Sequence, residues 1–536
     1  MAELHTQYHL YQPPRYRASD GSWNRIFRDA VVRSNTGPGT HLHWEPAAVM
    51  SINSYGYTCG DLTLLREIRR QPWLSEIGLD GQPYLLEIPR HDTLWSTYPE
   101  IARRLCDLLA DEAEEASRDF DEVYVLLSGG LDSRVTAGTL ARLVREGRLK
   151  SPPVAITWGL PDSRDVIYGR EIARMLGMEW IYIPIDEEVL LRNVDWSAKT
   201  LAGMLSPVHQ HMMEGLSRLS RSALVFGTSY GDSVGRAEFS GKHLLELMPL
   251  KPTNPFGLLA PGVEQEAADA LYHELKALRD RTPGQPRYVI CEHEMHAHYT
   301  RGHLAHAMSS INDFCTVYQL FTAPQVYSYM WSLHPALRYN EIYAELLDQL
   351  DPRLARLPWA RTNQGMKGTS LDKSQIGSLR ERFHLYRDWI AGPLYEKMLQ
   401  RIDLERLAAT GIFNMDCVRA LIAEAHHAGP APGQQPTYVM AWLATFNRLA
   451  DWLDELGVQV EPVRVTTASA GYIQPVHQQR PGLLRRARNQ LQRSPLLRRW
   501  VHEARCYVLR RQARKQFPPR MNSSQGVNQQ GQGQPG

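Results

Sequence analysis

The chain has 536 residues, of which 43% are hydrophobic and 22% charged, proportions typical of a globular protein with more than one domain. Sixty Lys and Arg against 58 Asp and Glu give a formal net charge of +2, and no apolar run reaches the roughly 18 residues of a membrane span. The amino terminus lacks the features of a secretory signal, and the six cysteines form no Cys-x-x-Cys pair. We therefore expect a cytoplasmic protein in a reducing compartment, without a zinc ribbon.

The apolar run 123–127 predicts a strand, and it leads through Ser128-Gly129-Gly130-Leu131-Asp132-Ser133 into a helical pattern over 134–140. A strand that turns through glycines into a helix presents backbone N–H groups and the positive helix end to one point, which suits a polyphosphate. Phosphates repel a carboxylate unless a divalent cation lies between them, so Asp132 implies Mg²⁺. No Gly-Lys-Ser/Thr element follows, so this is not a loop whose lysine holds a transferring terminal phosphate. The alternative is a glycine turn before an ordinary helix.

Further strands are predicted at 153–158, 179–185 and 223–226, with a helix over 162–176. Strands that alternate with helices at this spacing predict an α/β fold with a doubly wound parallel sheet. Ligands collect at the carboxyl ends of such strands, where Thr157–Gly159 and the loop from Gly227 to Asp232 also fall. Two glycine-and-aspartate loops are thus expected to meet in one crevice.

The Ser128–Ser133 loop resembles the pyrophosphate loop of the N-type ATP pyrophosphatases, which split ATP between its first and second phosphates. Together with Thr157–Gly159, Asp165 and the turn that ends in Asp232, it is similar to the synthetase domain of asparagine synthetase-like proteins, whose relatives include β-lactam synthetases and lasso-peptide cyclases. The resemblance extends over about residues 45 to 455 through less specific segments. It implies a sheet of the adenine-nucleotide α-hydrolase-like type and a helical second half.

The resemblance implies a role for each matching residue. Asp132 and Asp232 would hold Mg²⁺. The ATP contacts would come from Leu126, Leu127, Ser128, Gly129, Gly130, Asp132, Ser133, Thr157, Trp158, Gly159, Gly227 and Gly231. Leu126 and Leu127 are core residues as well, and Gly159 can be read as a turn.

Two departures from the family pattern concern the nucleophile. Glutamine-dependent members carry a cysteine after the initiator methionine, whereas this chain reads Met1-Ala2-Glu3. Tyr55–Thr58, with the leucines up to Ile68, resembles the last strands of the glutaminase sandwich, so we expect 1–95 to be a small β-rich, inactive remnant. The synthetase domain would then span 96–465. Near Asp232, Ser229 and Tyr230 replace a glutamate of ammonia-using members; Tyr230 is a candidate for amine deprotonation, with a tyrosine packed on the sheet rim as the alternative.

A basic residue is needed to stabilise the negative charge that develops on an acyl-adenylate and its tetrahedral intermediate. Related enzymes take it from the segment that corresponds to 358–368. Arg361 fits the spacing and Lys367 fits the glycine-flanked context, so both remain candidates.

The segment 480–520 holds thirteen Lys and Arg and one acid, Glu503. We expect a basic helical segment over 466–520 that contacts an acidic membrane surface, nucleic acid or the acidic body of its own enzyme, and a disordered tail over 521–536. No specific nucleic acid is predicted. The histidines between His293 and His306 lack the spacing of a His-Glu-x-x-His zinc site, which favours a polar helix face with some buried histidines.

These observations predict an ATP- and Mg²⁺-dependent, AMP-forming ligase that joins a small-molecule or peptide carboxylate to an amine or ammonia. The alternatives are a macrolactam-forming peptide cyclase of the lasso type and a non-catalytic nucleotide-binding scaffold. The sequence leaves the substrate and the oligomeric state open.

Overall fold

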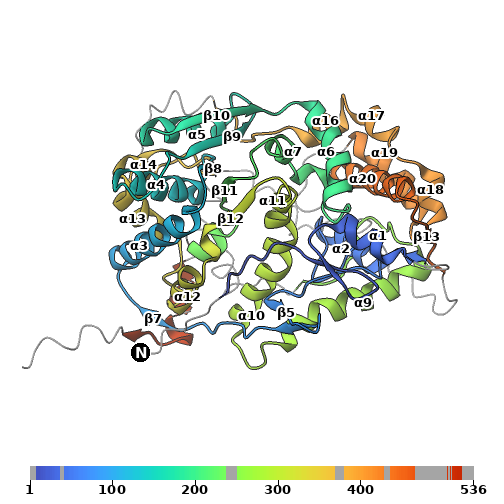
Figure 1. Cartoon of the computed structure of the whole chain (residues 1–536), viewed down its shortest axis with the longest axis horizontal. Helices are drawn as coiled ribbons and strands as arrows, with labels where there is room; N and C mark the ends of the chain where they lie inside the picture. Colours follow the sequence, from blue (N-terminus) through green and yellow to red (C-terminus); the bar gives the residue numbers. More distant parts are fainter. Residues whose placement is uncertain are drawn as a thin grey trace, which may run out of the picture.

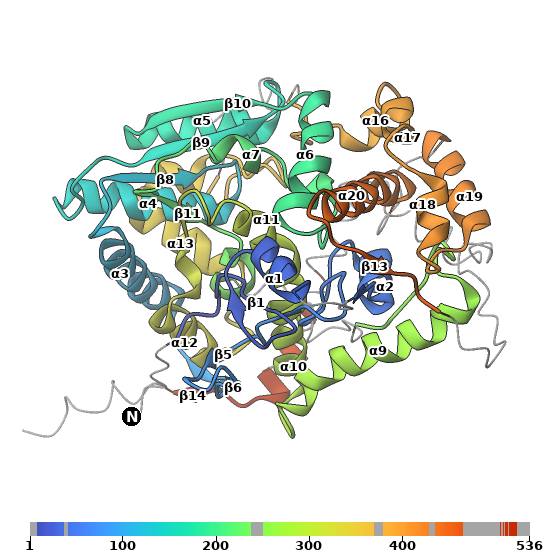
Figure 2. The ribbon, with the colours of Figure 1, turned by 45° about the vertical axis from the view of Figure 1, so that its right-hand side comes forward.

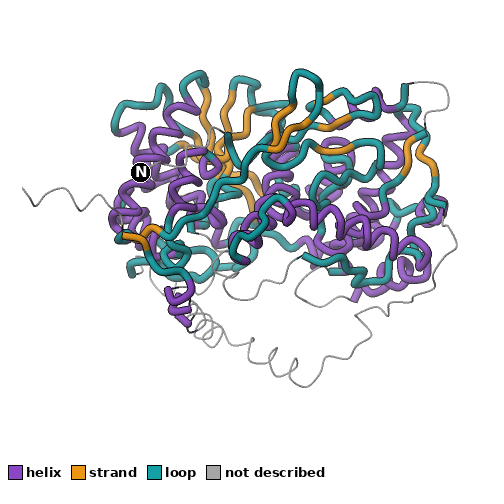
Figure 3. Tube along the Cα trace, turned by 90° about the horizontal axis from the view of Figure 1, so that it is seen from below, coloured by secondary structure: helices purple, strands orange, loops and turns teal. Residues whose placement is uncertain are grey.

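A five-stranded parallel sheet forms the centre of the computed structural model, which describes residues 8–36, 41–236, 250–368, 379–427, 435–464, 504, 507, 508, 510–512 and 514–521. The strand order is β10-β9-β8-β11-β12. Figure 3 shows the strands in orange among the purple helices. The bounds are β8 Glu122–Leu126, β9 Val154–Gly159, β10 Glu179–Pro184, β11 Ala223–Gly227 and β12 Thr316–Gln319. The parallel α/β prediction is confirmed, and β12 is an edge strand that the sequence analysis missed. The winding direction reverses between β8 and β11, so these neighbours form the topological switch point of the sheet.

The central strands β9, β8 and β11 are buried on both faces, as their continuous apolar runs require, whereas the edge strand β10 has no fully buried residue. Val123, Val125 and Leu127 join the core under α3 (Tyr98–Ser117), α4 (Leu131–Arg145) and α13 (Asn340–Leu350). Leu126 faces the opposite side, toward α7 (Met213–Leu216) and Ile311. Figure 1 shows α3, α4 and α13 gathered together on one side of the molecule. Neighbouring side chains of β8 are thus buried on opposite faces of the sheet. This burial holds the carboxyl end of β8, and with it the start of the following loop.

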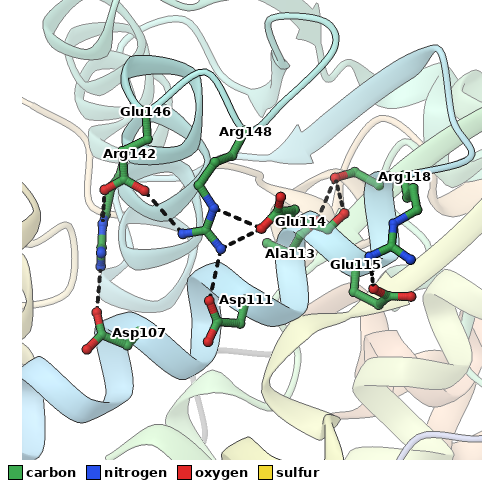
Figure 4. Close-up of polar contacts among 10 residues, drawn as sticks. Asp107, Asp111, Ala113, Glu114, Glu115, Arg118, Arg142, Glu146 and Arg148 are labelled. Atoms are coloured by element: carbon green, nitrogen blue, oxygen red, sulfur yellow. Dashed lines mark hydrogen bonds and ion pairs between the residues drawn. The ribbon is translucent and has the colours of Figure 1, made fainter.

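Ion pairs fasten the end of α4 to α3 (Figure 4). Arg142 bridges Asp107 on α3 and Glu146 at distances of 3.1 and 2.6 Å, and Arg148 pairs with Asp111 and Glu114 at 2.9 and 2.5 Å. Isolated surface pairs contribute at most about 1 kcal/mol, but a shared network restrains the geometry of the helices it joins. α4 is thus held at the end opposite to the Ser128–Ser133 loop.

The second half is helical, as expected, and it shares one core with the amino-terminal region. α20 (Pro436–Glu455) packs on α6 (Glu187–Thr200), and α2 (Pro46–Tyr55) packs on α9 (Pro261–Asp280) (Figure 2). Buried apolar residues between Tyr16 and Ile68 contribute to this core together with residues of α6, α9 and α20. The remaining α-helices are α1 Phe27–Ser34, α5 Arg164–Leu176, α10 Arg287–Glu294, α11 Ala305–Ser309, α12 Pro324–Ser332, α14 Pro352–Arg356, α16 Tyr386–Ala391, α17 Tyr395–Leu399, α18 Leu404–Ala409 and α19 Met415–His427.

Short strands and irregular helices complete the described elements. The strands are β1 Tyr16–Arg17, β2 Trp23–Asn24, β3 Leu42–His43, β4 Arg69–Arg70, β5 Ser75–Ile77, β6 Pro83–Leu85, β7 Leu94–Trp95, β13 Val460–Glu461 and β14 Arg520–Met521. The 3₁₀ helices are η1 Pro207–His209 and η4 Leu320–Thr322, and the π-helices are η2 Gly231–Gly235 and η3 Met295–Leu304.

The strands expected between Tyr55 and Ile68 do not form, so this expectation was wrong. α2 runs to Tyr55, and Gly56 ends it in the left-handed conformation with φ of +88°. The consecutive residues Leu62, Thr63, Leu64 and Leu65 are all buried, whereas the residues of a half-exposed strand alternate between core and solvent. The glutaminase-remnant origin of residues 1–95 and the domain limits stay predictions.

The described end of the basic segment lies on the body of the protein. Arg510 makes two contacts with Glu341 at 2.7 and 2.9 Å, and β14 pairs with β7. Residues 465–503 and 522–536 lie outside the described residues, and with them most of the expected basic helix and tail. Within the described part, none of the helices combines the length and the apolar character needed to cross a membrane.

Candidate functional site

The loop between β8 and α4 is held closed by its own hydroxyls. The Ser133 hydroxyl accepts the Ser128 N–H at 3.1 Å, the Ser128 hydroxyl accepts the Gly130 N–H at 3.1 Å, and the two hydroxyl oxygens lie 3.1 Å apart. The Gly129 N–H donates to Asp165 at 3.1 Å. These three N–H groups, expected to face phosphates, are thus engaged within the protein. Gly130 caps α4 without a side chain, which leaves the N–H groups of the first helical turn to an anionic ligand or solvent.

Arg134 clamps this loop to the segment after α14. Its fully buried guanidinium donates to the carbonyls of Gly129, Leu354, Leu357 and Pro358 at 2.8 to 3.1 Å. Burial lowers the pKa of Arg134 to about 10. Because a planar fork of five donors fits several carbonyls at once, arginine is suited to this position. Arg134 therefore links the loop directly to residues 354–358.

The two aspartate loops touch at the switch point. A Cβ placed on Gly231 would lie 2.5 Å from the Cβ of Asp132, so only glycine allows this approach. The Tyr343 hydroxyl donates to the Gly231 carbonyl at 2.9 Å. Burial first, and then the negative charges of Asp132 and Asp232, raise the pKa of Tyr343. Both carboxylates therefore lie within electrostatic reach of one phenol.

Arg236 lies against Asp132. Its Nε and Nη2 are 3.3 and 3.4 Å from the two carboxylate oxygens, and its Nη1 donates to Asn340 at 3.2 Å. Its guanidinium carbon is 5.2 Å from the centre of the Trp359 ring. A cation already paired with Asp132 shows that this carboxylate accepts positive charge. Mg²⁺ prefers one or two carboxylates together with substrate phosphates, so Asp132 and Asp232 fit such an ion. The described residues contain no group of three or more His, Cys, Asp or Glu arranged to hold a metal.

A pocket of about 320 Å³ opens beside the loop. It is lined by Gly130, Asp165, Trp359, Ala360, Arg361, Glu381, Arg382, Phe383 and His384. Arg361 lies at this pocket, with its guanidinium carbon 5.7 Å from the Trp359 ring centre. Lys367 pairs instead with Glu345 and Asp348 on α13 at 2.9 and 3.1 Å. The geometry therefore favours Arg361 over Lys367 as the basic residue.

The residues expected at the adenine fall into two groups. Leu126, Leu127 and Thr157 are buried, and the Thr157 hydroxyl donates to the Leu127 carbonyl at 2.8 Å. Trp158 packs partly buried between two cores. Gly159 has φ of +143° and lies against Phe383, a pocket residue. Of this set, Gly159 is thus the residue that directly supports the wall of the pocket.

Gly227 and Tyr230 belong to the packing around the second loop. A Cβ on Gly227 would lie 2.6 Å from the Gln319 amide nitrogen of β12. The Tyr230 ring is 1% exposed and stacks on His296, with ring centres 5.7 Å apart. Burial, and then Tyr11, raise the pKa of the Tyr230 hydroxyl. A phenol with a raised pKa is a poor base at neutral pH, so the placement favours the packing alternative.

Sequence reasoning missed Arg134, Arg236, Tyr343 and the pocket residues 381–384. Arg236 stands four residues after Asp232, which was the available hint. Residues 381–384 carry no motif and reach the site only through the fold: the Leu160 N–H donates to the Phe383 carbonyl at 2.8 Å. The histidines 293, 296, 298 and 306 are buried, in keeping with the interpretation of a helix face with buried histidines.

Fold and site together define an α/β domain in which an uncapped helix start and two aspartate loops in contact lie at the switch point of a parallel sheet. Residues 104–216 match the family model described as asparagine synthase. An asparagine synthetase (glutamine-hydrolyzing) from Pongo abelii is 34% identical over 70 residues, which are 13% of this chain. The chain thus spans about 12% of the length of that curated relative. Over these residues the chain is similar to asparagine synthase.

Solved structures with partial similarity include an NH3-dependent NAD synthetase from Campylobacter jejuni and an NMN synthetase from Francisella tularensis. The first is 22% identical and covers 26% of this chain and 61% of that one, with a TM-score of 0.20. The second is 16% identical and covers 44% and 94%, with a TM-score of 0.21. Superpositions this weak carry no argument about the site.

Proposed function

We propose that the protein is an ATP-dependent, AMP-forming ligase that joins a carboxylate to an amine or ammonia. The proposal rests above all on the contact between the Asp132 and Gly231–Asp232 loops beside the first turn of α4. An anion at that turn and a divalent cation on the two carboxylates would compensate each other's charge. No lysine of a Gly-Lys-Ser/Thr element is present to hold a terminal phosphate, which argues against transfer of that group.

In the proposed reaction, an oxygen of the substrate carboxylate attacks the α-phosphorus of ATP. The bond between the α-phosphorus and the bridging oxygen to the β-phosphate breaks, and pyrophosphate leaves. The amine then attacks the activated carbonyl, loses a proton, and releases AMP. Mg²⁺, when bound, supplies charge neutralisation for the leaving pyrophosphate.

The chain's own residues position and stabilise these groups. Asp132 and Asp232 hold the cation, and the first turn of α4 orients an anionic phosphate. Arg361, at the pocket, stabilises negative charge that develops on the acyl group, as a preorganised cation does in a partly desolvated site. Arg134 ties the loop to the segment that leads into Trp359–Arg361, and so holds the two in a fixed relative position.

Nucleotide products separate this proposal from a nucleotide-binding scaffold. The protein is incubated with Mg²⁺, ATP and panels of carboxylates and amines, and the nucleotides are separated by chromatography. AMP and pyrophosphate in equal amounts, lost in Asp232→Ala, support the ligase. Stoichiometric ADP would reject it, and binding without turnover across the panels favours the scaffold.

A further inference from the structure

Arg236 stands where a cation is needed on Asp132. It extends from the residue after η2, with 6% of its side chain exposed, and faces a carboxylate that is 18% exposed. A carboxylate with this little exposure is costly to keep ionised without a positive partner. The guanidinium supplies that partner in the protein alone.

The pairing is looser than a fixed structural ion pair. Its N–O distances of 3.3 and 3.4 Å exceed the roughly 2.7 to 2.9 Å of a strong charge-assisted hydrogen bond. By contrast, Arg510 approaches Glu341 to 2.7 and 2.9 Å. Aromatic faces hold the guanidinium from the side, with ring centres 5.2 Å away at Trp359 and 5.8 Å at Tyr343. Cation–π contact stabilises an arginine without fixing which anion it pairs with.

We propose that Arg236 occupies the cation position on Asp132 in the nucleotide-free protein, and that it exchanges this carboxylate for the pyrophosphate part of ATP when metal and nucleotide bind. This inference rests on the proposed nucleotide site. A guanidinium and a divalent ion repel each other on one carboxylate, so binding of the ion favours release of the guanidinium. Released from Asp132 beside the first turn of α4, the guanidinium pairs with phosphate oxygens, whose geometry arginine forks fit.

The proposal predicts opposite effects of one substitution on two ligands. Removing the competing charge in Arg236→Gln tightens binding of Mg²⁺ alone by about tenfold. The same change weakens binding of inorganic pyrophosphate in the presence of Mg²⁺ by about tenfold, because a charged hydrogen-bond donor is lost. Arg236→Lys keeps the charge, so its Mg²⁺ affinity stays near that of the wild type. Arg353→Gln, which changes an arginine paired with Asp351 at 2.6 Å, is the matched control and leaves both affinities unchanged.

Titration calorimetry on the full chain measures both affinities without turnover, so the result is independent of whether the ligase substrate is known. Weaker or unchanged Mg²⁺ binding in Arg236→Gln overturns the exchange, as does the absence of Mg²⁺ binding in both proteins. Unchanged pyrophosphate binding in Arg236→Gln would contradict the pairing of Arg236 with the phosphates. If Arg236→Gln folds poorly, recovery of its thermal melting point by Mg²⁺ alone supports the proposal, and failure to recover at saturating Mg²⁺ contradicts it. If the wild type forms no AMP with any carboxylate and amine while both binding effects are observed, the ligase fails and the exchange stands.

Discussion

Asp165 carries a stability cost that depends on pH. Burial raises the pKa of its carboxyl to about 6, against about 3.9 in an unfolded chain. At pH 8 the carboxyl is ionised in both states, and a difference of about two pKa units costs the folded state at most about 3 kcal/mol. Below about pH 4 the carboxyl is protonated in both states and the cost vanishes. Stability from this group is thus complete well below pH 4, falls as pH rises from about 4 to about 6, and changes little above the folded-state pKa.

Asp165→Asn removes the charge but keeps an oxygen that can accept the Gly129 N–H, now 3.1 Å away. We expect it to increase the free energy of unfolding by up to about 3 kcal/mol at pH 8 and by little at pH 4. Urea denaturation of both proteins at pH 4, 6 and 8, without nucleotide, measures the difference. The control is Asp162→Asn, whose carboxyl has its pKa lowered by the hydrogen bond from Arg380, so its substitution destabilises at pH 8. An Asp165→Asn protein that is no more stable than the wild type at pH 8 would refute the reasoning.

Two further predictions concern arginines near the loop. Arg134→Met leaves the carbonyls of Leu354, Leu357 and Pro358 without their Arg134 donor, while the Gly129 carbonyl keeps the Ala360 N–H. We therefore expect a loss of about 3 to 5 kcal/mol in the free energy of unfolding, and equal urea midpoints would contradict the clamp. Arg361→Ala should lower the rate of AMP formation by about a hundredfold, as loss of a charge-stabilising group does, whereas Lys367→Ala should change it much less because Glu345 and Asp348 hold that ammonium. The reverse order of the two rates would assign the role to Lys367.

The sheet and its two loops could be predicted because their information is local. Val123 to Leu127 is apolar throughout, and the glycines and Asp132 follow directly. One short segment therefore contains the signals for the strand, the turn and the start of the helix. The strand Thr316–Gln319 was not predicted because it is only four residues long. A segment this short shows too little hydrophobic periodicity to identify a strand. Tyr55–Ile68 misled because buried apolar residues at irregular spacing resemble a strand until the helices that cover them are known.

The candidate site was predictable only in part, for a related reason. Asp132 and Asp232 come with glycine turns, so each was visible in its own segment. Arg236 belongs to the site because it contacts Asp132, over a hundred residues earlier in the chain, and Trp359, more than a hundred residues later. Tyr230 was singled out by its place in the loop, but the stacking with His296 that buries it depends on η3. Contacts between distant segments are not encoded in any one pattern.

Binding of Mg·ATP tests the central claim most directly, because every proposed step needs the nucleotide at the Ser128–Ser133 loop. Titration calorimetry of the wild type with ATP, in the presence of Mg²⁺ and after its removal by chelation, should show binding that depends on the ion. Asp132→Asn, which keeps the size of the side chain and removes its charge, should abolish that dependence. Equal Mg·ATP affinities of the wild type and Asp132→Asn would contradict the account.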